Sequence, residues 1–291
     1  MASAASHRAS FSQKQAPVRL RTICAFFAVS LAGSWTLWLW PVNEQASFHI
    51  TIGRWWISIP LPLAIEIAGN CVPGVLALLW SIREGREQVR LILSSLIRWR
   101  IPSKFYMFSL VLPAGLFWIS LGFIFLRYPS GHALPSVFRV ATTLLLTLPF
   151  GPLWEELAWR AYALRKLETR FTPLASALFL GLYWGVWHIP LWLTTMTIAP
   201  GMKIPVLVLA CVNLIAWSVI FTFMYERSGQ SLPATILLHG TYAAVATEMS
   251  NVMPQNDFAL IVASSLLSSC VALILGARLR ADVTAPLYHD V

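Results

Sequence analysis

The chain is organised around the stretch Gly151-Pro152-Leu153-Trp154-Glu155-Glu156-Leu157-Ala158-Trp159-Arg160-Ala161-Tyr162. Two adjacent carboxylates and one arginine stand here in otherwise apolar sequence. Proline suits the first turn of a helix, so Pro152 predicts a helix start that leaves Glu155 and Glu156 near the positive end of the helix dipole. Arg160 follows Glu156 by four residues, which is the spacing for an ion pair on one helical face.

The sequence around this stretch is typical of a membrane span, because residues 141–150 are almost entirely apolar. An ionisable residue inside a membrane helix costs about 2.5–3.5 kcal/mol on insertion scales. Three such residues within one short segment would be difficult to retain without a function, so we expect the functional site here. A simpler interpretation ends the span at Leu153 and leaves both carboxylates solvated, but the apolar sequence continues to Leu164.

The composition predicts an integral membrane protein. Of the 291 residues, 57% are hydrophobic and 11% are charged, and the mean hydropathy is +0.68. A soluble globular domain has about 25% charged residues. The four cysteines lie apart in apolar runs without a CxxC motif, so we expect neither a disulfide framework nor a zinc knuckle.

Eight apolar runs predict an all-α, polytopic bundle of about eight spans, since each has about the 20 residues that cross a bilayer. The runs are 23–42, 57–82, 105–126, 140–164, 174–194, 204–225, 232–249 and 258–277. We expect them to form one membrane domain over 23–277, between a basic tail (1–22) and a second tail (278–291). Basic and apolar residues alternate over 83–100, which is typical of an amphipathic helix lying in the membrane interface.

The positive charges predict the orientation of the bundle. With the N-terminus in the cytoplasm, only Arg54, Arg127, Arg139 and Lys203 of the 21 lysines and arginines fall on the outer side. This bias predicts that both termini are cytoplasmic, in the plasma (inner) membrane. The net charge of +9 is then a basic face against anionic lipid headgroups and not a nucleic-acid site. Glu248 and Asp257 are predicted to be solvated groups at the interface.

Two of the six histidines, His188 and His239, lie inside predicted spans. At 1.5 Å per residue, they and the two glutamates fall within the cytoplasmic two-thirds of a core about 30 Å thick, so they could converge in one cavity. Each histidine alone could equally be a hydrogen-bonded core residue.

Two carboxylates and two imidazoles in one apolar cavity favour hydrolysis. A glutamate can act as general base on a water, one histidine can hold that water, and the other can bind the oxyanion. Glu155, His188 and His239 could instead bind zinc, although the usual HExxH motif is absent.

Three motifs resemble those of the CPBP family, the CAAX-protease and bacteriocin-processing (Abi) intramembrane endopeptidases: Glu155-Glu156-x-x-x-Arg160, Trp184-x-x-x-His188 and a later His239. The resemblance covers about 80–250. It implies hydrolysis of a peptide bond in a membrane-associated or lipidated (CAAX-type) peptide, with no obligatory cofactor and zinc possible. It also implies residue roles. Glu155 and His188 would activate water, Glu156 with Arg160 would hold the site, and His239 would stabilise the oxyanion.

The chain departs from the family pattern at two positions. Trp184 stands where the family usually has phenylalanine, and we expect it to serve packing, together with Trp187. More seriously, Ala243 stands where the family usually has asparagine or aspartate, one turn after His239. Candidates to replace this missing donor are Asn213, Asn70 and Thr241.

Two other functions remain open because of these features. Ala243 motivates a non-catalytic membrane adaptor that keeps the fold and has lost turnover. The buried ionisable groups also suit a transporter with a proton relay, although no inverted repeat is found.

Overall fold

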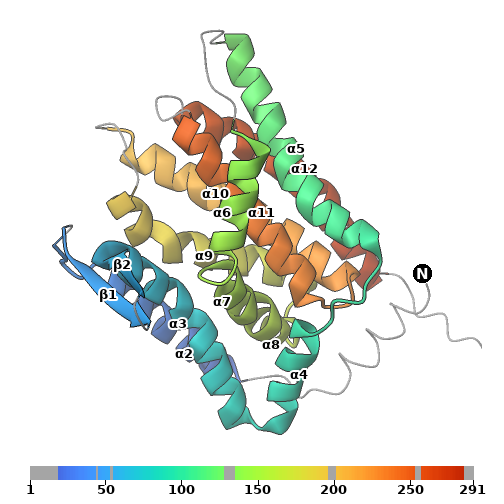
Figure 1. The fold of residues 1–291 in the computed structure, drawn as a ribbon. Helices are drawn as coiled ribbons and strands as arrows, with labels where there is room; N and C mark the ends of the chain where they lie inside the picture. The colour runs from blue at the N-terminus through green and yellow to red at the C-terminus, as the bar shows by residue number, and fades with distance from the viewer. Residues whose placement is uncertain are drawn as a thin grey trace, which may run out of the picture.

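The computed structural model describes residues 19–43, 45–52, 55–127, 135–195, 201–252 and 257–284 (Figure 1). Its elements in chain order are α2 (Leu20–Trp38), β1 (Ser47–Ile52), β2 (Trp55–Pro60), α3 (Leu61–Glu84), α4 (Arg86–Leu96), α5 (Ser103–Arg127), α6 (Val137–Thr147), α7 (Pro152–Glu156), the π-helix η1 (Leu157–Leu164), α8 (Arg165–Glu168), α9 (Pro173–Thr195), α10 (Lys203–Arg227), α11 (Leu232–Val252) and α12 (Asp257–Thr284).

The predicted polytopic helical bundle is confirmed. Among the described residues, six helices are long and apolar enough to cross a membrane, namely α2, α3, α5, α9, α10 and α12. The bent pair formed by α6 and the segment α7–α8 can supply a seventh span. These segments, together with the 21-residue α11, correspond to the eight predicted apolar runs. The chain is therefore an integral membrane protein. The outermost parts of both predicted tails, 1–18 and 285–291, lie outside the described residues.

The beginning of the second predicted span is not helical. The strands Ser47–Ile52 and Trp55–Pro60 pair antiparallel, with Ser47 opposite Pro60 and Ile52 opposite Trp55. The helix α3 begins at Leu61, four residues later than the apolar run suggests. The segment Trp55–Pro60 is rich in aromatic and β-branched residues, which favour a strand. Hydropathy does not distinguish such a strand from the first turn of a membrane helix.

The fourth predicted span is not one continuous helix. It breaks between α6 and α7, where the axes bend by 56°. Gly151 has non-helical angles (φ −133°, ψ −74°), and Pro152 has no N–H with which to continue the ladder. As the sequence predicts, a new helix starts at Pro152 and carries Glu155 and Glu156 in its first turns. The two glutamates therefore lie just after the bend between α6 and α7.

The acid-bearing segment lies at the centre of the bundle. Figure 1 shows α7 and α8 between α3 on one side and α11 on the other, and both neighbouring helices contact α7. Every residue of η1 is buried. Gly74 of α3 makes this close packing possible, since a Cβ there would lie 2.6 Å from the backbone oxygen of Trp154. A side chain at position 74 would thus push α7 away from α3.

The predicted amphipathic helix is present as α4. It buries Leu91, Ile92 and Ser95 against the bundle and leaves its basic residues exposed. Arg165 connects α4 to the rest of the molecule, because its Nη2 donates to Ser95 (2.6 Å) and its Nε donates to Tyr225 (3.1 Å). The placement of α4 in the membrane interface remains a prediction.

Candidate active site

Glu155 is buried and held by two tryptophans. Its side chain is 4% exposed, and its Oε2 accepts hydrogen bonds from Nε1 of Trp184 (2.6 Å) and Nε1 of Trp159 (3.4 Å). Its second oxygen, Oε1, has no hydrogen-bond partner among the residues that the structure describes. One oxygen of this carboxylate is therefore fixed by the protein, and the other is available to a water.

Glu156 is completely buried and has two nitrogen partners, a guanidinium and an imidazole. Its Oε1 lies 3.1 Å from Nη1 of Arg160 and 2.9 Å from Nδ1 of His239. The Arg160 guanidinium, itself 0% exposed, stands over the rings of Trp184 and Phe221 at 5.4 and 4.8 Å. The ion pair has the four-residue spacing that the sequence predicts. The interpretation of the two glutamates as solvated groups at a membrane boundary is wrong.

The two neighbouring glutamates serve different helices because successive helical residues point about 100° apart. Glu155 is directed towards Trp184 on α9, whereas Glu156 is directed towards His239 on α11. The adjacent glutamates thus connect one turn of α7 to two separate helices, α9 and α11.

His188 of α9 is held by its own helix. Its Nδ1 lies 2.9 Å from the Trp184 carbonyl oxygen, and its ring stacks on Trp192 at 5.3 Å with an interplanar angle of 17°. A carbonyl oxygen only accepts, so Nδ1 carries the proton in this bond and Nε2 of the neutral ring is an acceptor. Glu155 lies within electrostatic range of His188 but makes no direct hydrogen bond to it in the described structure.

His239 of α11 is 5% exposed and approaches Trp184 edge-on, with the ring centroids 5.2 Å apart. Its Nδ1–H donates to Glu156, which leaves Nε2 for another partner. The next residue, Gly240, allows α11 to approach α6, since a Cβ there would lie 2.6 Å from Leu148 and 2.7 Å from Leu144. Close packing of these helices places His239 beside the acid pair.

Trp184 has a larger part in this site than its sequence position suggests. It contacts four of the five predicted residues: it hydrogen-bonds Glu155 and His188 and packs against His239 and Arg160. The prediction that it serves packing is therefore incomplete. A buried indole N–H usually bonds an acceptor, and this preference is a sequence signal that could have indicated the bond to a buried acid.

The residues that could replace the missing donor at position 243 differ in availability. Thr241 donates its hydroxyl to the Leu237 carbonyl of its own helix (2.8 Å). Asn70 makes no hydrogen bond from its side chain to another described residue. Asn213 accepts from Ser268 and donates to the hydroxyl of Tyr242, the residue directly before Ala243.

The donor set does not form a ready metal site. Within the described ranges, no three His, Cys, Asp or Glu side chains gather closely enough to hold a metal ion. Glu155, His188 and His239 each have one atom already bonded to Trp184 or Glu156.

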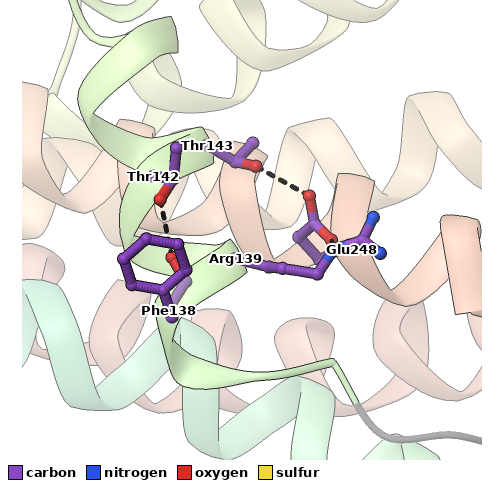
Figure 2. Close-up of a pocket in the computed structure, with 5 residues that line it drawn as sticks. All are labelled: Phe138, Arg139, Thr142, Thr143 and Glu248. Carbon is purple, nitrogen blue, oxygen red and sulfur yellow. Dashed lines mark hydrogen bonds and ion pairs between the residues drawn. The ribbon is translucent and has the colours of Figure 1, made fainter.

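Glu248 also differs from its prediction, because it is 4% exposed and not solvated. Figure 2 shows it at a small surface pocket of about 200 Å³ between α6 and α11, where Nε of Arg139 donates to Oε2 (2.8 Å) and the Thr143 hydroxyl donates to Oε1 (2.7 Å). Its charge is therefore matched within the protein. These bonds fix α6 against the helix that carries His239. Asp257 has no described side chain.

Comparison with known proteins supports the resemblance seen in the motifs. Residues 135–245 match the family model described as "Type II CAAX prenyl endopeptidase Rce1-like". A "CAAX prenyl protease 2" from Methanococcus maripaludis is 31% identical over 65 residues, which are 22% of this chain and 23% of that protein. The matching segment thus spans about a quarter of this relative's length. The matched family region includes every predicted site residue, from Glu155 to His239.

Proposed function

We propose that the protein is an intramembrane endopeptidase, because residues 135–245 match the type II CAAX prenyl endopeptidase family model. Its substrate class is a membrane-associated or lipidated peptide with a scissile bond near the membrane. The observation that carries the proposal is that the two buried glutamates have different partners. Glu155 shares Trp184 with His188 and keeps one oxygen without a described partner, whereas Glu156 bonds His239.

Glu155 is the proposed general base. Its Oε1 and the Nε2 of His188 are the two acceptors left over by the bonds to Trp184. A water between them would be oriented by both and would lose its proton to Glu155. The indole bond to Oε2 prevents the carboxylate from rotating away from this water.

His239 is the proposed oxyanion donor, and Glu156 is its positioning residue. The site contains two carboxylates, one guanidinium and one imidazole whose Nδ1 donates to Glu156. Protonation of His239 balances the charges of Glu155, Glu156 and Arg160 and provides an Nε2–H donor. Such a donor, already oriented in an apolar site, stabilises the charge that develops on the carbonyl oxygen.

The proposed reaction uses water alone as co-reactant. The water oxygen adds to the peptide carbonyl carbon, its proton moves to Glu155, and the carbonyl π electrons become the lone pair of the oxyanion. When the oxyanion collapses, the C–N bond breaks, and its electron pair remains on nitrogen. Glu155 returns the proton to that nitrogen, which releases an amine and a carboxylic acid and regenerates the site.

The proposed orientation places the basic residues of α4 and both termini at the cytoplasmic face of the plasma (inner) membrane, in contact with anionic headgroups. Support comes from the distribution of the 21 lysines and arginines along the sequence. The substrate would enter from this side, and its lipid tail would remain in the bilayer.

Cleavage of a fluorogenic peptide by the purified protein in vesicles tests the proposal. The peptide carries a C-terminal CAAX sequence and is offered with and without a prenyl group. We expect cleavage by the wild-type protein and its loss in Glu155→Gln, which keeps the shape of the side chain and removes the base. Undiminished cleavage by Glu155→Gln overturns this mechanism. Saturable peptide binding without cleavage by the wild-type protein would favour the adaptor function that Ala243 motivates.

A further inference from the structure

Tyr242 lies beside the place where the family pattern expects a side-chain donor. It follows His239 by three residues, so the two side chains share one face of α11. Its ring lies 4.5 Å from Trp217 and 6.4 Å from Phe221, and Phe221 also packs on His239 at 5.5 Å. The tyrosine ring is thus one aromatic contact away from the pair formed by Glu156 and His239.

A chain of hydrogen bonds from two other helices holds the Tyr242 hydroxyl. Ser268 of α12 donates to Oδ1 of Asn213 (2.8 Å), and Nδ2 of Asn213 on α10 donates to the Tyr242 hydroxyl oxygen (3.1 Å). Ser268 is 0% exposed and Asn213 is 8% exposed. In the structure, Oδ1 of the Asn213 amide faces the Ser268 hydroxyl and its Nδ2 faces Tyr242.

The direction of this chain leaves the Tyr242 proton unused. The hydroxyl oxygen already accepts from Asn213, and its own proton has no acceptor in the part of the chain that the structure describes. A hydroxyl that accepts one hydrogen bond becomes a stronger donor in the next, because the bonds polarise one another.

We propose that the Tyr242 hydroxyl, held by Asn213 and Ser268, donates the second hydrogen bond to the tetrahedral oxyanion. The inference rests on the proposed peptidase function. It makes Tyr242 a catalytic residue that replaces the donor missing at Ala243, and it makes Asn213 a positioning residue. Phenol hydroxyls are known oxyanion donors in enzymes. Together with Nε2–H of His239, the site then has the two donors that a tetrahedral intermediate requires.

The substitution Tyr242→Phe tests this inference, because it removes the hydroxyl and keeps the ring. We expect kcat to fall by about 10²–10³, the usual effect of losing one oxyanion donor, with KM within about twofold of the wild-type value. A structural role alone would change stability and KM without this selective loss in kcat. The matched control is Tyr106→Phe, which removes a hydroxyl bonded to the Trp99 carbonyl and should leave both constants unchanged.

Two further variants strengthen the test. Asn213→Leu should lower kcat by about tenfold, because the tyrosine keeps its hydroxyl but loses one neutral hydrogen bond that orients it. Ala243→Asn in the Tyr242→Phe background should restore at least tenfold of the lost kcat, since it supplies a donor one turn from His239.

The outcomes separate this inference from the proposed function. If the wild-type protein cleaves the peptide and Tyr242→Phe cleaves it with the same kcat, only the inference is overturned. A loss in Tyr242→Phe that Ala243→Asn does not restore, together with a lowered melting temperature, also overturns it. Failure of the wild-type protein to cleave any peptide of the set overturns the peptidase function itself and this inference with it.

Discussion

The indole nitrogen of Trp184 lies 2.6 Å from Oε2 of Glu155, and the backbone oxygen of the same residue lies 2.9 Å from Nδ1 of His188. One residue therefore orients both the proposed base and its histidine partner. Hydrogen bonds to an ionised group are short and roughly twice as strong as neutral ones. Trp184 stands where the family motif usually has phenylalanine, and its indole N–H donates a hydrogen bond to the Glu155 carboxylate.

Trp184→Phe should remove this donor and keep an aromatic ring beside His239 and Arg160. We expect kcat to fall by about 10–100-fold, because a hydrogen bond to a charged group contributes about 1.5–3 kcal/mol. The measurement is kcat and KM for peptide cleavage, in protein that passes a folding check. Trp187→Phe on the same helix is the matched control, since the Trp187 Nε1 has no partner among the described residues. Equal losses in the two variants would show that ring size, and not the indole bond, matters.

Arg160→Leu should destabilise the folded protein. Removing one partner of a buried ion pair leaves an uncompensated charge, which costs about 3–5 kcal/mol of the free energy of unfolding. Denaturant titration in detergent measures this change and requires no substrate. The double variant Arg160→Leu, Glu156→Leu should recover part of the loss, since both charges are then absent. A single variant as stable as the wild-type protein would contradict the burial of this pair.

Gly74→Ala should separate α3 from α7. The added Cβ would meet the Trp154 backbone oxygen at 2.6 Å, and a backbone atom cannot move aside as a flexible side chain can. We expect a loss of about 1–3 kcal/mol in the free energy of unfolding, as for other overpacked positions, together with reduced cleavage.

Gly115→Ala on α5 is the control for this packing prediction. No atom lies within 4 Å of a Cβ at position 115, so the change should be neutral or stabilising by about 0.5–1 kcal/mol, the helix preference of alanine over glycine. Equal destabilisation by both substitutions would show that the contact with Trp154 does not cause the loss of stability in Gly74→Ala.

Chelation should leave peptide cleavage unchanged. The described residues gather no group of three metal ligands, and Glu155 is held by indole donors that a bound cation would displace. The assay compares initial rates before and after treatment with a membrane-permeant chelator and dialysis. Loss of activity that zinc restores would require Glu155, His188 and His239 to rearrange around the ion.

The sequence predicted the elements of this protein better than it predicted their contacts. The start of α7 at Pro152 and the pairing of Glu156 with Arg160 follow from rules that act within one helix. Which spans face which glutamate depends on the rotation of separate helices about their axes, and hydropathy carries no such information. The bond from Trp184 to Glu155 therefore had to come from coordinates.

The errors in the predicted fold have a common physical cause. A hydropathy run records apolar length, so it joined β2 to α3 and α6 to α7, although a hairpin and a bend of 56° interrupt these runs. The same limit applies to Glu248, because its burial depends on Arg139 and Thr143 from a distant part of the chain. Contacts between segments far apart in sequence are the information that a single sequence lacks.

The placement of two adjacent glutamates against two different helices also restricts how this segment can change in length. One residue inserted or deleted between Pro152 and Glu155 would turn both glutamates by about 100° around the helix axis. Glu155 and Glu156 could then no longer meet Trp184 and His239 together. Substitutions can change the side chains of this turn, but the positions of α9 and α11 fix its number of residues.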